Sequence, residues 1–229
     1  MSRALQAIVF DFDGVIANSE PLHLKAFQQA LAQEGIELDA TEYYARYLGY
    51  DDVGMFEALA KDRRISMSGE HVTALVARKG ERMQDMLRSG TVLFPGATEF
   101  IREAAAAVPI AIASGAMRHE IEEVIDAAGV SDLFATIVAA GDTPQSKPSP
   151  APYRLALERL RETSGRVIDP RRAVAIEDSK WGLESAQGAG LRLVGVTNSY
   201  PAHELTGAEL VVDSLTALTL PALDRLCAT

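Results

Sequence analysis

The chain has 229 residues, of which 48% are hydrophobic and 24% charged, the proportions of an ordinary folded globular protein. Its formal net charge of -10 repels nucleic-acid backbones and anionic membranes, so we expect neither as a partner. The single cysteine, Cys227, excludes an intrachain disulfide, and with no signal peptide or spanning segment evident we expect a soluble, cytoplasmic monomer or weak homodimer.

Short apolar runs recur along the chain and are typical of strands that are buried on both faces of a parallel sheet. They lie at residues 7–12, 109–113, 135–139, 173–176, 191–196 and, more weakly, 210–212. Helical patterns lie between them, at residues 99–107, 118–128, 151–161 and 179–189. Because strands alternate with helices, the sequence predicts an α/β fold with a Rossmann-like, doubly wound parallel sheet.

Residues 20–89 interrupt this alternation. They contain helical patterns at 21–33, 52–60 and 69–87 and no clear strand. A helical block between the first strand and the others is most simply an inserted small domain. The Pro-Gly turn in LFPGA at 93–97 marks the return to the sheet. We therefore predict an α/β core of residues 1–17 and 91–229 and a small α-helical domain of residues 18–90.

Polar residues follow each of the five clear strands. They are Asp11 and Asp13 after the first strand, Ser114 and Gly115 after the second, Lys147 in the loop after the third, Glu177 and Asp178 after the fourth, and Asn198 and Ser199 after the fifth. Open parallel sheets bind ligands at the carboxyl ends of their strands, so we expect these residues to share one edge. Taken singly, Ser114 and Asp178 are also explained as helix caps, Lys147 as a solvated lysine, and Asn198 and Ser199 as the turn before Pro201. Asp11 is harder to explain in this way, because a buried acid needs a partner.

This set of residues favours phosphoryl transfer. Converging carboxylates repel one another and need a hard cation such as Mg²⁺, which substrate phosphate commonly helps to coordinate. Backbone N–H groups around Ser114 and Gly115 are suited to phosphate oxygens, and Lys147 to the charge on a transferring phosphoryl group. An aspartate serves as a nucleophile for phosphoryl groups, and a second carboxylate as general acid and base. Asp11 and Asp13 fit this division.

Four motifs carry a resemblance to a known family. They are DFDGVIANSEPLH from residue 11, IASG at 112–115, SKPSPAPY at 146–153 and IEDSKWGLESAQGAG at 176–190. In order and spacing they resemble the motifs of the haloacid dehalogenase (HAD) superfamily, in its β-phosphoglucomutase-like phosphatase branch. The matches span nearly the whole chain.

The resemblance implies a role for each polar residue. Asp11 would be the nucleophile and a Mg²⁺ ligand. Asp13 would be the general acid and base and would ligate Mg²⁺ through its backbone carbonyl. Ser114 and Lys147 would hold the phosphoryl group. The helical domain, by the same resemblance, would be a cap that closes over the site.

The remaining acids and the substrate follow from the same resemblance. Glu177 and Asp178 would complete the Mg²⁺ site. The expected reaction is hydrolysis of a small phosphorylated metabolite, a sugar phosphate or a phosphoglycolate-like compound, through an aspartyl-phosphate. The alternative is a β-phosphoglucomutase-like sugar phosphomutase, which His23 and Arg118 favour and the acids after Gly49 disfavour. Gly115, His23 and Arg118 are the candidate substrate contacts.

Two roles are possible for each of four charged residues of the helical domain. Asp51 and Asp52 either face a substrate or cap the helix that starts near Val53, and we favour the helix cap. Arg46 and Lys79 either contact a substrate anion or are solvated surface charges, and we favour surface charges.

Overall fold

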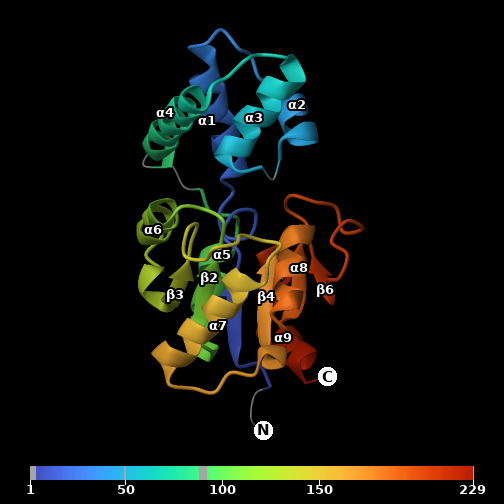
Figure 1. The fold of residues 1–229 in the computed structure, drawn as a ribbon. Coiled ribbons are helices and arrows are strands. Elements are labelled where there is room, and N and C mark those ends of the chain that lie inside the picture. Colours follow the sequence, from blue (N-terminus) through green and yellow to red (C-terminus); the bar gives the residue numbers. More distant parts are fainter. Residues whose placement is uncertain (1–3, 49, 88–91, 229) are drawn as a thin grey trace. The chain divides into compact units, whose positions relative to one another are not determined.

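The computed structural model describes residues 4–48, 50–87 and 92–228, and the chain divides into two compact units. The core unit comprises Met1–Asn18 and Thr91–Thr229, and the helical unit comprises Ser19–Gly90 (Figure 1). The expected boundary at residues 90 and 91, and Gly49, lie outside the described residues.

A six-stranded parallel sheet forms the centre of the core unit. Its strands are β1 (Ala7–Phe10), β2 (Ile110–Ala113), β3 (Phe134–Val138), β4 (Ala173–Glu177), β5 (Arg192–Val196) and β6 (Leu210–Val212). They lie in the order β3-β2-β1-β4-β5-β6, and every neighbouring pair is parallel. The prediction of a doubly wound α/β fold with an inserted helical domain is confirmed.

Helices cover both faces of the sheet. The core unit contains α5 (Ala97–Ala107), α6 (Arg118–Ala127), α7 (Ala151–Ser164), α8 (Lys180–Gly188) and α9 (Leu220–Cys227), with 3-10 turns η1 (Ser131–Leu133), η2 (Pro170–Arg172) and η3 (Leu215–Ala217). Figure 1 shows α7 and α8 on the same face. Alternate residues of β1 pack against the helices on opposite faces of the sheet. Val9 belongs to the hydrophobic cluster under α7 and α8, whereas Phe10 packs edge-on against Phe100 of α5.

The strand order places the first and fourth strands side by side at the middle of the sheet. From β1 the chain winds outward through β2 to β3, and it then returns to β4 on the other side of β1 and winds outward again. Such a reversal separates the loops that leave the two central strands and opens a crevice at their carboxyl ends. Asp11, which follows Phe10, and Glu177, which ends β4, therefore meet at this point.

The helical unit contains α1 (Glu20–Ala32), α2 (Ala40–Arg46), α3 (Asp52–Arg63) and α4 (Gly69–Leu87). Its core gathers aromatic and aliphatic side chains around Phe27, which packs edge-on against Phe56. The sequence patterns did not predict the short helix α2, although Asp39 caps it by accepting from the N–H groups of Thr41 and Glu42. Seven residues give too few apolar repeats for a periodic signal.

The lysine of α4 that we expected at the surface is buried. Lys79 is 1% exposed, and its Nζ lies 2.8 Å from Asp52 Oδ1 and 2.8 Å from His23 Nδ1, over the ring of Phe27. The prediction that Lys79 is a solvated surface charge is wrong. The ammonium can be buried because Asp52 offsets the cost of removing it from water. Arg46, by contrast, is exposed and pairs with Asp62. Asp51 caps α3 by accepting from the Gly54 N–H, as expected. The same expectation for Asp52 is wrong, because Asp52 is the first residue of α3 and its carboxylate pairs with Lys79.

This buried pair predicts unequal effects of removing its two members. Asp52→Ala leaves the Lys79 ammonium without its counter-charge and should lower the free energy of unfolding by about 2 kcal/mol, discounted for the partial exposure of Asp52. Lys79→Met replaces the chain with an apolar one of similar length and should cost less than about 1 kcal/mol. Urea denaturation measures both, with Glu57→Ala on the exposed side of α3 as control. Equal losses for the two variants would contradict the pairing argument.

Candidate active site

The first strand delivers Asp11 into the crevice. The Asp11 N–H still donates to the Ile176 carbonyl at 2.9 Å, so the residue continues the pairing with β4. The chain then turns, because the N–H groups of Ile16 and Ala17 both donate to the Phe12 carbonyl at 2.9 Å. Asp13 lies inside this turn. The strand is therefore shorter than the apolar run, which extended to Phe12.

A lysine from a distant loop reaches Asp11. Lys147 lies between β3 and α7, and its Nζ is 2.8 Å from Asp11 Oδ1 and 2.6 Å from Glu177 Oε1. All three side chains are largely shielded from water. The Phe12 N–H also donates to Asp11 Oδ1 at 2.7 Å. The structure thus brings together residues from three of the predicted strand ends.

Glu177 ends β4 and is completely buried. Besides Lys147, it accepts hydrogen bonds from the Tyr153 hydroxyl at 2.7 Å and from the Ser179 hydroxyl at 3.2 Å. Sequence reasoning missed Tyr153, although this residue closes the SKPSPAPY motif. A tyrosine in the first turn of an amphipathic helix resembles any core aromatic until its hydroxyl partner is known.

Asp178 lies against the turn that holds Asp13. A Cβ on Gly14 would come within 1.7 Å of Asp178 Oδ2, so only glycine lets this carboxylate approach the turn. Gly14 also has a φ of 75°, in the left-handed region that favours glycine. Ser199 hydrogen-bonds to Asp178, and Asn198 Nδ2 donates to the Gly14 carbonyl at 2.7 Å. Both residues after β5 therefore shape the site.

Ser114 is buried at the end of β2 and does not cap a helix. Its Oγ accepts from the Ala116 N–H at 3.0 Å, and α6 begins later, after Met117. The hydroxyl is held in a tight turn beside the exposed Gly115. This turn explains why a small Ser-Gly pair follows the strand, and it contradicts the helix-cap reading of Ser114.

The electrostatics of the site call for a cation. Burial, followed by the charges of Glu177 and Asp178, raises the pKa of Asp11 well above its ordinary value, against the opposing effect of Lys147. Burial and Glu177 likewise raise the pKa of Asp178 to about 7. The pKa of Lys147 is raised because its two carboxylate partners outweigh burial. One ammonium is too little charge for this many carboxylates.

The donor set fits a hard divalent cation. Carboxylate oxygens of Asp11, Glu177 and Asp178 lie within 4.8 Å of one another, and all three residues are buried. Oxygen ligands of this kind suit Mg²⁺. Asp13 stands close enough for its charge to raise the pKa of Asp178.

A protein-family model described as haloacid dehalogenase-like hydrolase matches residues 5–190 of this chain. The chain belongs to the haloacid dehalogenase-like hydrolase family. The family resemblance of the four motifs is thereby confirmed. Among the described residues of this HAD protein, none of the helices has the length and apolar character needed to cross a membrane.

Similar HAD proteins cover almost the whole chain. Protein CbbY of Rhodobacter capsulatus is 32% identical over 231 residues, which is 97% of this chain and 99% of the relative. Phosphoglycolate phosphatase of Yersinia pestis is 26% identical over 204 residues, 86% of this chain and 83% of the relative.

Solved structures of CbbY from Rhodobacter sphaeroides have the same fold. The complex with phosphate superposes with a TM-score of 0.81 at 32% identity, covering 96% of this chain and 99% of that one. A mutant in complex with xylulose-(1,5)-bisphosphate gives a TM-score of 0.79 at 32% identity, covering 93% and 96%.

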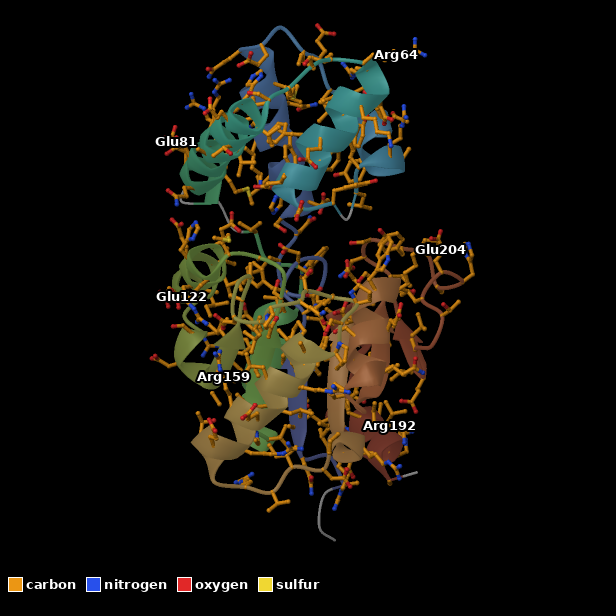
Figure 2. All side chains as sticks on the ribbon, viewed as in Figure 1. Arg64, Glu81, Glu122, Arg159, Arg192 and Glu204 are labelled. Atoms are coloured by element: carbon orange, nitrogen blue, oxygen red, sulfur yellow. The ribbon has the colours of Figure 1, made fainter. Side chains whose placement is uncertain are left out.

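Two candidate substrate contacts of this HAD protein have partners of their own. Arg118 donates to the Ile137 carbonyl and to Asp142 Oδ2, at 3.0 and 2.8 Å, and it also pairs with Glu122. Arg159 of α7, which Figure 2 labels, makes the same two contacts at the same distances. The two guanidinium groups clamp Asp142, which lies in the loop that carries Lys147.

His23, in the helical unit, accepts the Lys79 bond described above. Burial, and next the Lys79 charge, lower the pKa of His23 to about 3, so the imidazole is neutral at physiological pH. This contact gives His23 a packing role inside the helical unit. Its expected contact with substrate stays a prediction.

The close approach at Gly14 yields one prediction. Gly14→Ala should reduce turnover by about 100-fold, because the new methyl must displace the Asp178 carboxylate. Gly165→Ala is the matched control, since Gly165 also has a positive φ, 63°, and has open space around it. Both variants should lose about 1 kcal/mol of stability because of the positive φ, and Gly14→Ala should lose more because it displaces the carboxylate. Only Gly14→Ala should lose activity, measured as phosphate release. Comparable activity in the two would contradict the proposed contact.

The contacts of Arg118 and Arg159 with Asp142 lead to a second prediction about the site. Either arginine alone can hold Asp142, so Arg118→Ala should change KM less than about twofold and stability by less than about 1 kcal/mol. Adding Arg159→Ala should lower kcat by more than the product of the single effects, because the Lys147 loop is then released. Glu122→Ala, which removes only the exposed pair of Arg118, serves as control. A tenfold rise in KM from Arg118→Ala alone would instead place Arg118 on the substrate.

Proposed function

We propose that this protein is a Mg²⁺-dependent phosphatase that hydrolyses a small phosphorylated metabolite through an aspartyl-phosphate on Asp11. One observation carries the proposal: Lys147 Nζ contacts Asp11 within a group of buried carboxylates that fit a divalent cation. The family and the names of the relatives support it.

The residues divide the chemistry in two steps. In the first, an Asp11 carboxylate oxygen attacks phosphorus, the ester P–O bond breaks, and the leaving oxygen takes a proton from Asp13. In the second, Asp13 removes a proton from water, whose oxygen attacks phosphorus. The bond to Asp11 breaks, which releases inorganic phosphate and restores the carboxylate.

Lys147 and Ser114 serve the phosphoryl group. The Lys147 ammonium stands beside Asp11 and would offset the negative charge on the phosphoryl oxygens during transfer. The Ser114 hydroxyl, held in its turn, offers a hydrogen bond from the end of the neighbouring strand. Mg²⁺ held by Asp11, Asp178 and the backbone carbonyl of Asp13 would supply further positive charge at the same oxygens. Glu177 is the remaining candidate ligand.

A sugar phosphate is the proposed substrate class. CbbY, 32% identical to this chain, has been solved with xylulose-(1,5)-bisphosphate, so this compound is the first to test. Phosphoglycolate is the second, from the name of the Yersinia pestis relative. The helical unit is the proposed cap that selects between them.

The test is a phosphate-release assay on these compounds and a panel of sugar monophosphates, with Mg²⁺ and with EDTA. The wild type should release phosphate only with Mg²⁺, and Asp11→Asn should lower the rate on the order of a thousandfold or more. Asp126→Asn, an exposed acid on α6, is the control. Full activity in Asp11→Asn would overturn the mechanism, and isomerisation of a sugar phosphate without phosphate release would replace the phosphatase with the mutase.

A further inference from the structure

The buried carboxylate of Glu177 is surrounded by hydrogen-bond donors. Lys147 Nζ and the Tyr153 hydroxyl both bind Oε1, at 2.6 and 2.7 Å, and the Ser179 hydroxyl binds Oε2 at 3.2 Å. A carboxylate oxygen has about two good acceptor positions. Oε1 is therefore filled by protein donors, and Oε2 keeps one position. The protein donors thus anchor the Glu177 carboxylate and leave one position on Oε2 for a metal ion.

Tyr153 contacts both members of the Glu177–Lys147 pair. Its hydroxyl donates to Glu177, and Lys147 Nζ lies 5.2 Å from the centre of its ring, a cation–π distance. Tyr153 itself has no exposed surface and comes from the first turn of α7, where the cluster under α7 and α8 holds its ring. The ring and the hydroxyl together define where the ammonium can lie.

Gly182 of the neighbouring helix α8 leaves room for the Glu177 carboxylate. A Cβ on Gly182 of α8 would come within 2.0 Å of three atoms of the Glu177 carboxyl group. Ser179, which binds Glu177, is also the N-cap of α8 and accepts from the Gly182 N–H at 3.1 Å. The start of α8 therefore closes the remaining side of the carboxylate and places it beside the positive end of the helix.

We propose that Tyr153 is a positioning residue that acts through Glu177 to hold the Lys147 ammonium against the nucleophile Asp11. Without the hydroxyl, Glu177 has one donor fewer on Oε1, and its attraction for Lys147 increases. The ammonium then moves away from Asp11 and from the phosphoryl group. The proposal rests on the proposed phosphatase function, which it deepens by adding a residue that the motifs do not assign.

Tyr153→Phe tests the proposal, because it removes one oxygen and keeps the ring. We expect kcat to fall about 10- to 100-fold, the effect of one hydrogen bond to a charged group, with KM changed less than about threefold. Tyr47→Phe is the matched control, since Tyr47 is equally buried and donates to Asp62 in the helical unit. An unchanged kcat in Tyr153→Phe, or a loss confined to KM, would overturn the proposal.

A measurement of metal affinity distinguishes a Tyr153 that positions Lys147 from a Tyr153 that supports Glu177 as a metal ligand. Loss of an outer partner of a metal ligand weakens binding about 10- to 100-fold. We expect Tyr153→Phe to bind Mn²⁺, titrated by electron paramagnetic resonance, within about threefold of wild type, while Asp178→Asn binds it at least about tenfold more weakly. A tenfold loss in Tyr153→Phe, with kcat restored by excess Mg²⁺, would assign Tyr153 to the metal site and overturn the proposal.

A readout independent of turnover keeps the two proposals distinguishable. A wild type that hydrolyses no phosphomonoester would refute the phosphatase, whereas a crystal structure of Tyr153→Phe would still test the position of Lys147. We expect Nζ to move out of hydrogen-bond range of Asp11 while it remains on Glu177. Retention of both contacts, at 2.8 and 2.6 Å as now, would overturn the positioning role.

Discussion

The mutual repulsion of carboxylates at the ends of β1 and β4 is the constraint on which this structure depends. Asp11, Glu177 and Asp178 meet where water is largely excluded, with the half-buried Asp13 beside them, and burial alone would drive such groups to bind protons. Lys147 offsets part of the charge, and a divalent cation fits the remainder. Much of the local architecture can be understood as a means of holding these groups in place.

Glycines and hydroxyls provide that means. Gly14 and Gly182 each leave out a side chain so that a carboxylate can lie against the backbone, Asp178 in the first case and Glu177 in the second. The hydroxyls of Tyr153 and Ser179 bind Glu177. None of these four residues is a titratable acid or base at neutral pH, so they position charge without adding to it.

The helical unit solves a smaller version of the same problem. Lys79 is buried between α1 and α3, where Asp52 supplies the opposite charge and neutral His23 an acceptor. The core unit brings an ammonium to an excess of carboxylates, and the helical unit brings a single carboxylate to a buried ammonium. Both arrangements follow from the same cost of removing charge from water.

By itself, the sequence determined the alternation of strands and helices, the inserted helical block and the polar residues at strand ends, because apolar periodicity and motif spacing are local properties. It could not show α2, which is too short for periodicity, nor the end of β1 at Phe10, which the turn at Phe12 decides. Only the tertiary structure revealed that Lys79 is buried, that Arg118 clamps Asp142, and that Tyr153 binds Glu177. Each of those contacts joins residues at least 24 positions apart, so its energy depends on how distant segments pack.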